Sequence, residues 1–291
     1  MLPPKLTLTV AFSLALPFLA LAEAAVAEPV LLSGFAHPES VLPVGEAIFV
    51  SNLGAKLDPM GKDGDGFISR LSADGALVTL KAMTGLDAPK GMAFADGKLF
   101  VTDIDRVVGF DPSTGAQVFA ASMDCATPCF FNDLAVAEGR LLLSDTAQGK
   151  LWALEIQSGA FTQLAEGMNG PNGVIWDAEQ RRAVVVELGA DFAGGDIYTW
   201  SEAEGLAKIP TSPHGVFDGL ALLPDGRALV SDWVGLKGEA GALLAVDLAT
   251  GATETLGLPQ TLHGPADFAL TADKLWLPAM LDGAVAVLPA P

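Results

Sequence analysis

The sequence predicts an all-β fold, a six-bladed β-propeller, and three observations support this prediction. A repeat of about 44 residues runs through the chain, which is close to the length of one propeller blade. Short alternating apolar segments are separated by turn signals every eight to twelve residues or so. Helical periodicity is absent outside the N-terminal segment. Together these features favour four-stranded blades arranged around a central axis.

Each repeat opens with Pro or Phe, then a polar residue, a small residue and an apolar run. These openings, the expected inner strands, begin at Pro38, Pro89, Phe131, Pro171, Phe217 and Pro265. Second strands are predicted at 47–52, 98–103, 140–145, 182–187, 227–232 and 274–279. Third strands are predicted at 66–71, 107–111, 150–155, 196–200, 242–247 and 284–289.

The last repeat ends after three strands, whereas residues 30–35 form an apolar run that belongs to no repeat. This run can supply the missing outer strand of the last blade. Both ends of the chain would then close one blade, and no long strand edge would remain open.

The first 27 residues resemble a signal peptide. Lys5 precedes an apolar stretch over residues 6–22, and Ala25-Val26-Ala27 fits the small-x-small cleavage pattern. Cleavage after Ala22 is the alternative. We therefore expect a periplasmic or secreted protein whose residues 28–291 form one propeller domain, with no membrane span after processing.

The net charge of -19 argues against two classes of partner, nucleic acids and anionic membranes. Nucleic acids and anionic lipid headgroups both require a surface rich in Lys and Arg. We expect a monomer that acts on a small molecule.

Cys125 and Cys129 are the only cysteines, and an exported chain favours a disulfide between them. So short a loop contributes little loop-closure entropy. We expect this disulfide to shape the segment that leads into Asn132.

Four inner-strand openings place an oxygen-bearing side chain at the same position, namely Glu39, Asn132, Asn172 and Asp218. Inner strands line the channel of a propeller, so these side chains should converge on its axis. Two carboxylates there would repel each other unless a cation separated them. Carboxylate and amide oxygens suit Ca²⁺, or another hard cation such as Mn²⁺ or Mg²⁺. The sequence therefore predicts a metal site on the axis.

The ordered set of motifs PESVL, FNDLA, PNGVI and FDGLA resembles the senescence-marker-protein/gluconolactonase family of six-bladed calcium-dependent lactonases, and paraoxonases share the general plan. The resemblance covers nearly all of residues 28–291. It implies that Glu39, Asn172 and Asp218 are metal ligands. It further implies that Asn132 lies beside the metal and the substrate, and paraoxonases use this Asn as a ligand.

The chain departs from these relatives at two positions. Gluconolactonase-like members carry an Arg that helps to hold the sugar, where this chain has Phe130. This departure argues against a sugar-acid lactone as the substrate. We expect Phe130, Phe131, Met92 and Phe217 to form a more apolar entrance. Paraoxonases carry a His where this chain has Lys90. Lys90 should pair with Glu39 or a substrate carbonyl, and it would be a base only if its pKa were strongly lowered.

Other polar residues are expected near one mouth of the channel. His37, His214 and His263 each precede an inner strand and are candidate substrate contacts. Second strands end in Asp103, Asp145 and Asp232, which would either orient the Asn amides or cap turns. Residues 62–68 resemble an EF-hand loop, but both end ligands are missing, so we expect a long turn.

The sequence predicts a metal-dependent lactonase or esterase. The cation would polarise the ester carbonyl, and Asp218 would activate water with its second oxygen. Asp133 would help to orient water and substrate. The alternative is a non-catalytic propeller that binds a small ligand or a protein, since fold alone does not imply an activity.

Overall fold

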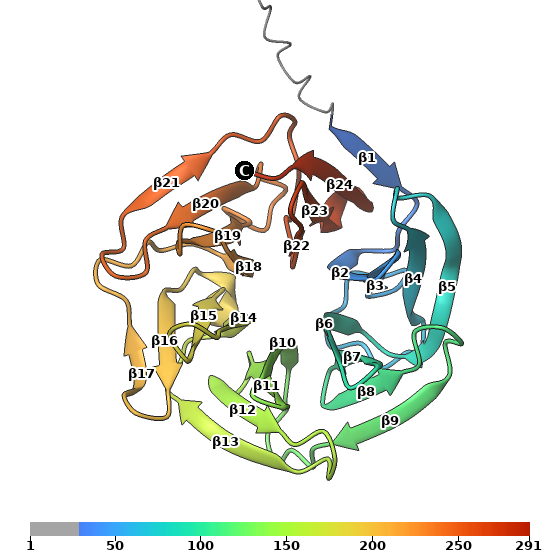
Figure 1. Cartoon of the computed structure of the whole chain (residues 1–291), viewed down its shortest axis with the longest axis horizontal. Coiled ribbons are helices and arrows are strands. Elements are labelled where there is room, and N and C mark those ends of the chain that lie inside the picture. Colours follow the sequence, from blue (N-terminus) through green and yellow to red (C-terminus); the bar gives the residue numbers. More distant parts are fainter. Residues whose placement is uncertain (1–28) are drawn as a thin grey trace, which may run out of the picture.

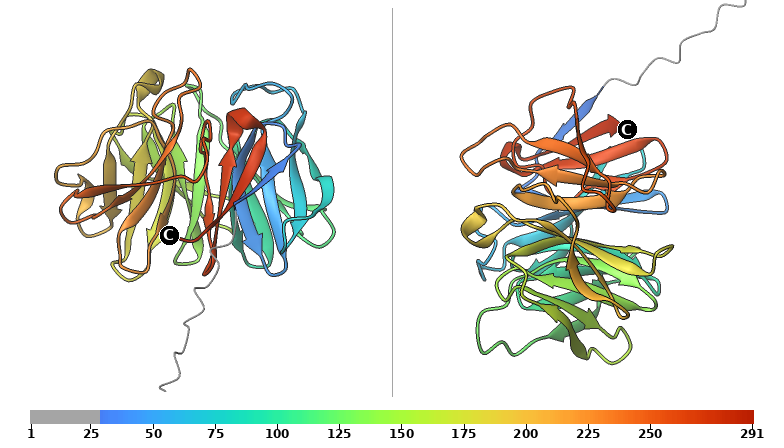
Figure 2. Two further views of the ribbon diagram at one scale, coloured as in Figure 1. Left: turned by 90° about the horizontal axis from the view of Figure 1, so that it is seen from above. Right: turned by 90° about the vertical axis from the view of Figure 1, so that its left-hand side faces the viewer.

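The computed structural model describes residues 29–291. The predicted signal peptide and both cleavage positions lie outside these residues. Within the described part of the chain, 24 strands form six four-stranded sheets arranged around a central channel, as predicted (Figure 1). The strands of each blade run roughly along the channel, so strand ends and their loops gather at the two faces (Figure 2). None of the helices among these residues is long and apolar enough to cross a membrane.

The strands of each blade follow the predicted order from the channel outward. The inner strands are β2 (Pro38–Val44), β6 (Pro89–Ala95), β10 (Phe131–Ala137), β14 (Pro171–Asp177), β18 (Phe217–Leu222) and β22 (Ala269–Leu270). The second strands are β3 (Ala47–Asn52), β7 (Lys98–Asp103), β11 (Arg140–Asp145), β15 (Arg182–Glu187), β19 (Ala228–Asp232) and β23 (Lys274–Ala279). The third strands are β4 (Gly66–Ser72), β8 (Arg106–Phe110), β12 (Lys150–Leu154), β16 (Ile197–Ser201), β20 (Ala242–Val246) and β24 (Ala284–Pro289). The outer strands are β5 (Leu77–Leu86), β9 (Gln117–Ser122), β13 (Phe161–Glu166), β17 (Gly205–Lys208), β21 (Thr253–Leu256) and β1 (Val30–Ser33).

The ring closes as the sequence predicts. The N-terminal strand β1 pairs antiparallel with the C-terminal strand β24, with Val30 opposite Val287. The sixth blade is therefore built from both ends of the chain (Figure 1).

The inner strand of the sixth blade is shorter than predicted. Pro265 forms only an isolated bridge with Ala279, and the regular strand β22 begins at Ala269. The intervening backbone pairs with the first blade instead: Asp267 N–H donates to Glu39 O at 2.9 Å, and Val41 N–H donates to Asp267 O at 3.3 Å. This contact joins the last blade to the first.

Apolar side chains fill the spaces between neighbouring blades. One buried cluster combines Phe100 of the second blade with Phe131 and Leu143 of the third, and another combines Val186 with Phe217 across the fourth and fifth blades. Strands buried on both faces explain why the second strands read as nearly continuous apolar runs. The polar residues at the inner-strand openings are exceptions to this pattern.

Candidate metal and active site

A β-bulge aims the polar residues of the inner strands at the axis. In β2, β6, β10, β14 and β18 the register with the second strand shifts directly after the first residue. The next two residues have no regular partner, as in Glu39-Ser40. Bulges turn a side chain away from the alternation of the strand, which accounts for polar side chains at the start of apolar runs.

Second-strand hydroxyl groups satisfy the backbone of several bulges. Ser51 Oγ accepts from Ser40 N–H at 2.9 Å, Ser144 Oγ from Asp133 N–H at 3.0 Å, and Ser231 Oγ from Gly219 N–H at 2.8 Å. A buried N–H without a partner would cost free energy. The recurrent Ser of the second strand thus holds the inner-strand opening in place.

The four predicted metal-ligand side chains line one cavity of about 240 Å³. Glu39 comes from β2, Asn132 from β10, Asn172 from β14 and Asp218 from β18. All four side chains are buried. Lys90 of β6 and Phe130 line the same cavity.

Within residues 29–291, three of these side chains carry buried oxygens that no hydrogen-bond donor reaches: Glu39 Oε2, Asn132 Oδ1 and Asp218 Oδ1. Unpartnered buried polar atoms are rare in folded proteins because each one costs free energy. Three of them around one cavity therefore point to a ligand that would satisfy them.

Three other polar atoms of the set are held by neighbours. Asn132 Nδ2 donates to Thr146 Oγ1 at 3.2 Å, and Asn172 Nδ2 donates to Phe217 O at 3.3 Å. The Trp233 indole N–H donates to Asp218 Oδ2 at 2.9 Å. These contacts fix which atom of Asn132 and of Asp218 faces the cavity.

Asp103, Asp145 and Asp232 do not orient the amides; the turn-capping alternative is correct. Each accepts a hydrogen bond from the backbone that leads into the inner strand of its own blade. For example, Asp232 Oδ1 accepts from Val216 N–H at 3.0 Å.

Burial dominates the electrostatics of the two carboxyl groups. It raises the pKa of Glu39 well above its usual range, and repulsion from Asp218, Asp267 and Asp133 adds to the effect. Burial, with a contribution from Asp267, raises the pKa of Asp218 to about 8. A cation bound between these groups would favour their ionised forms.

Lys90 is almost completely buried beside this set. Its Nζ donates to Ala88 O at 2.9 Å and lies 4.7 Å from the centre of the Phe130 ring. Burial lowers the pKa of Lys90 to about 8, although Glu39 opposes this shift. Within the described residues Lys90 forms no direct ion pair with Glu39, contrary to one expected pairing.

Asp133 and Met92 line a different cavity, together with Asp267. Asp133 Oδ2 accepts from Val174 N–H at 2.8 Å, and Asp133 Oδ1 accepts from Leu134 N–H at 2.6 Å. Both oxygens therefore hold backbone in place. Because Val174 belongs to β14, Asp133 joins the third blade to the fourth.

The other residues expected around the substrate do not line the cavity that holds the four oxygen-bearing side chains. Phe131 is fully buried and stacks on Phe161, with ring centres 5.5 Å apart. Phe217 is also fully buried, and it lines a smaller neighbouring cavity that shares Asn172 and Asp218 with the main one. None of the histidines in residues 29–291 lines that cavity: His37 Nδ1 is 3.0 Å from Gly54 O, His263 Nδ1 is 2.8 Å from Asp282 Oδ1, and His214 is exposed near Asp196.

The sequence analysis did not identify one repeated position, the residue directly after each second strand. In chain order these residues are Leu53, Ile104, Thr146, Leu188, Trp233 and Met280. Leu53, Leu188, Trp233 and Met280 line the cavity. Thr146 and Trp233 form hydrogen bonds with the side chains of Asn132 and Asp218. Their constant offset from the second strand is the signal that would have identified them.

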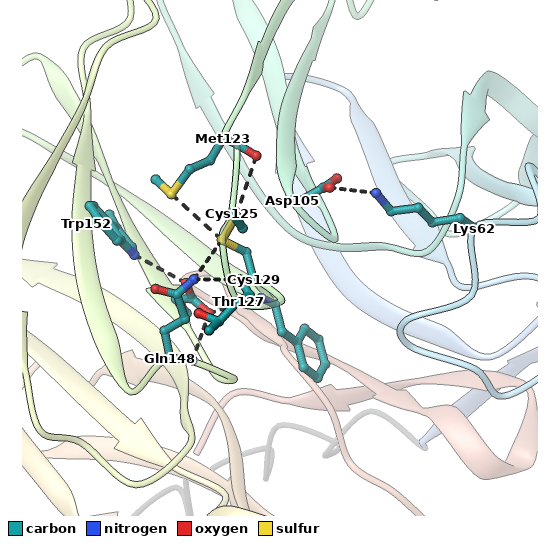
Figure 3. Close-up of a disulfide and its surroundings, with 10 residues drawn as sticks. Lys62, Asp105, Met123, Cys125, Thr127, Cys129, Gln148 and Trp152 are labelled. Carbon is teal, nitrogen blue, oxygen red and sulfur yellow. Dashed lines mark hydrogen bonds and ion pairs between the residues drawn. A yellow bond between two sulfur atoms is a disulfide. The ribbon is translucent and has the colours of Figure 1, made fainter.

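The predicted disulfide between Cys125 and Cys129 is present. It closes the loop between β9 and β10, and this loop ends at Phe130. Gln148 Nε2 donates to Thr127 O at 3.2 Å and approaches Cys129 Sγ at 3.1 Å (Figure 3). The loop is thus tied to the third blade next to the cavity.

The donor set fits a hard cation such as Ca²⁺, because the three unpartnered atoms are all oxygens. Among residues 29–291 no group of three or more His, Cys, Asp or Glu side chains is arranged to hold a metal ion. A cation on the axis therefore depends on the amides as well as on two carboxylates. Of the EF-hand-like residues 62–68, only 62–65 lie in the long turn between β3 and β4, and 66–68 already belong to β4. Lys62 pairs with Asp105 at 2.6 Å.

No protein-family model matches the chain, and a search of curated proteins also finds no match. Solved structures do match in fold. Virginiamycin B lyase from Staphylococcus aureus superposes with a TM-score of 0.59 at 12% identity, over 91% of this chain and 100% of the lyase. A catalytically inactive His-to-Ala form of that lyase, solved with quinupristin, has a TM-score of 0.60, with the same identity and coverage.

A protein of unknown function from Bacteroides thetaiotaomicron superposes with a TM-score of 0.68 at 13% identity. The match covers 90% of this chain and 76% of that one. At such identities these likenesses establish the six-bladed propeller fold.

Proposed function

We propose that this chain is a hydrolase of small lactones or carboxylic esters that depends on Ca²⁺ or a similar hard cation. The observation that carries the proposal is the set of unpartnered buried oxygens of Glu39, Asn132 and Asp218, which three different blades direct at one cavity. A bound cation would polarise the carbonyl of the substrate and stabilise the negative charge that develops on its oxygen.

The chain supplies the other groups that the reaction requires. Water adds to the carbonyl carbon and loses a proton to a carboxylate. The bond between the carbonyl carbon and the alkoxy oxygen then breaks, and the alcohol takes up a proton. The buried ammonium of Lys90 faces the same cavity and favours an anionic product.

The assignment of the proton acceptor changes once the contacts are considered. Trp233 occupies Asp218 Oδ2, the oxygen that was expected to activate water. Glu39 accepts no hydrogen bond from the described residues on either oxygen, so its carboxylate is freer to take a proton. We therefore place Glu39 beside Asp218 as a candidate general base.

Cleavage by elimination is the second reaction class to test, since virginiamycin B lyase shares the fold. A His-to-Ala form of that lyase is inactive, whereas no histidine among the described residues of this chain lines the cavity. A reaction that needs a histidine is therefore not supported in this cavity.

The test uses the purified protein, stripped with EDTA and assayed against lactones and aryl esters. Activity should disappear with EDTA and return with Ca²⁺. In H₂¹⁸O the product acid should gain one ¹⁸O atom, whereas elimination would yield unlabelled acid and an alkene. Turnover that persists without a divalent cation would contradict the mechanism, and metal binding without turnover of any substrate would favour a non-catalytic binder.

A further inference from the structure

The lining of the cavity narrows the class of substrate. We propose that this site takes lactones or esters that bear an unbranched alkyl chain, and that it discriminates against polyhydroxylated lactones. This inference rests on the proposed function for the carbonyl end of the substrate, and on the walls of the cavity for the rest.

The buried apolar part of the cavity lining offers no free hydrogen-bonding side chain. Leu53, Leu188 and Met280 are buried and apolar. The N–H of Trp233 is already engaged by Asp218. The hydroxyl of Thr146, the polar member of the same repeated position, donates to Pro171 O at 2.7 Å and accepts from Asn132. A sugar hydroxyl placed here would lose its water without gaining a partner, which costs free energy.

The part of the lining that reaches the surface is also apolar. Leu57, Phe192 and Leu236 line the cavity although each is 40% to 46% exposed. They come from three separate segments: the β3–β4 turn, the short 3₁₀ helix at Ala190–Phe192 and the β19–β20 loop. Met60 and Val234, on two of these segments, are exposed as well. Exposed apolar groups gathered around a cavity mouth mark a binding surface for an apolar ligand.

Strained backbone supports the same conclusion. Phe192 and Val234 have φ values of 57° and 63°, a left-handed conformation that is rare for aromatic and β-branched residues. Strain of this kind clusters at ligand sites. Here it occurs in two of the segments that carry the exposed apolar side chains.

The geometry also orients the substrate. The charged groups Glu39, Asp218 and Lys90 lie at the buried floor of the cavity, whereas the lining side chains that are exposed at its mouth are all apolar. The carbonyl would therefore lie at the floor and the alkyl chain along the wall. Since the wall extends to the surface, binding should improve gradually as the chain lengthens.

The first experiment measures kcat/KM with Ca²⁺ for γ-lactones whose alkyl substituent grows from none to six carbons. Each added CH₂ should raise kcat/KM about fourfold until the chain leaves the cavity, as expected for one buried methylene. Glucono-δ-lactone should be a poorer substrate than any of the alkyl lactones. A flat series, or a preference for glucono-δ-lactone, would overturn the inference.

The second experiment places a charge on the wall. Leu236→Asp should reduce the ratio of kcat/KM between the longest and the shortest lactone by at least tenfold, since a carboxylate beside a methylene chain removes its favourable burial. The matched control is Leu77→Asp, because Leu77 is 53% exposed on the outer strand β5, far from the axis. The control should keep the parent ratio, and an equal ratio in Leu236→Asp would contradict the proposal.

Direct binding separates this inference from the proposed activity. Alkyl carboxylates of four to eight carbons, and gluconate, are titrated into the Ca²⁺-loaded protein while tryptophan fluorescence is monitored. If no lactone is hydrolysed but affinity rises with chain length, the activity fails and the ligand class stands. If lactones are hydrolysed but gluconate binds as well as octanoate, the activity stands and the ligand class fails.

Discussion

Trp233 should control metal affinity, although it would not touch the metal. Replacing it by Phe keeps most of the ring volume and removes the N–H that donates to Asp218 Oδ2 at 2.9 Å. A hydrogen bond to a charged group contributes about 1.5–3 kcal/mol. Loss of a contact that orients a metal ligand typically costs about 10- to 100-fold in affinity. We therefore expect Trp233→Phe to weaken Ca²⁺ binding by about that factor.

The assay is a calorimetric titration of Ca²⁺ into the EDTA-stripped protein. The matched control is Trp152→Phe, which removes a similar indole contact, to Asp145 Oδ2 at 3.4 Å, away from the cavity. That variant should bind Ca²⁺ as the parent does. If Trp233→Phe also retains parent affinity while folded, the hydrogen bond does not orient Asp218, and the reasoning about the ligand set is wrong.

Three further predictions concern the carboxylates and the disulfide. Asp218→Asn and Glu39→Gln should each keep measurable Ca²⁺ binding. The variant that lacks the general base should lose activity by a factor on the order of 10² to 10⁴. If both variants turn over substrate at the parent rate with saturating Ca²⁺, neither residue is the base. Burial raises the pKa of Asp218 to about 8 and that of Asp267 to about 7 in the metal-free protein, against 3.8 when unfolded. The folded state thus binds more protons between those values, and the melting temperature without metal should fall as pH rises from 4 to 8. Saturating Ca²⁺ should reduce this fall, because the cation favours ionised Asp218, and a melting temperature that rises over this range without metal would contradict the assignment. A thiol titration of the denatured, unreduced protein should find no free thiol. Two free thiols would refute the disulfide between Cys125 and Cys129.

Much of the architecture could be predicted because it depends on patterns that repeat along the chain. The second strands 98–103, 140–145, 182–187 and 274–279 begin and end where the pattern indicates. The closing role of residues 30–35 follows from the one strand missing in the last repeat. The prediction was wrong where contact between blades overrides the repeat: Asp267 pairs with the first blade, so its own inner strand starts late.

The candidate site could be predicted only in part. Glu39, Asn132, Asn172 and Asp218 share a position in the repeat, and the bulge brings all four to one cavity. Which neighbours line the rest of that cavity depends on the direction of each side chain, and sequence spacing does not reveal this direction. The second residue of each bulge points in another direction than the first. Asp133, for example, lines a different cavity from its neighbour Asn132.

The apolar residues that line the cavity could not be predicted from the inner-strand openings. Phe130 lines the cavity, as Lys90 does, whereas Phe131 packs in the core between blades. Leu57, Phe192 and Leu236 lie on loops of unequal length that share no pattern. Only the folded arrangement shows that these loops meet at one mouth.

The most direct test of the central claim is the number of Ca²⁺ ions that the parent and the double variant Glu39→Gln/Asp218→Asn bind, measured by calorimetry on stripped protein. The account predicts one ion per parent chain with a Kd below about 1 mM. It predicts no measurable binding at that strength when both charges are removed and the fold, checked by circular dichroism, is retained. A parent chain that binds no ion, or a folded double variant that binds Ca²⁺ as tightly as the parent, would contradict it.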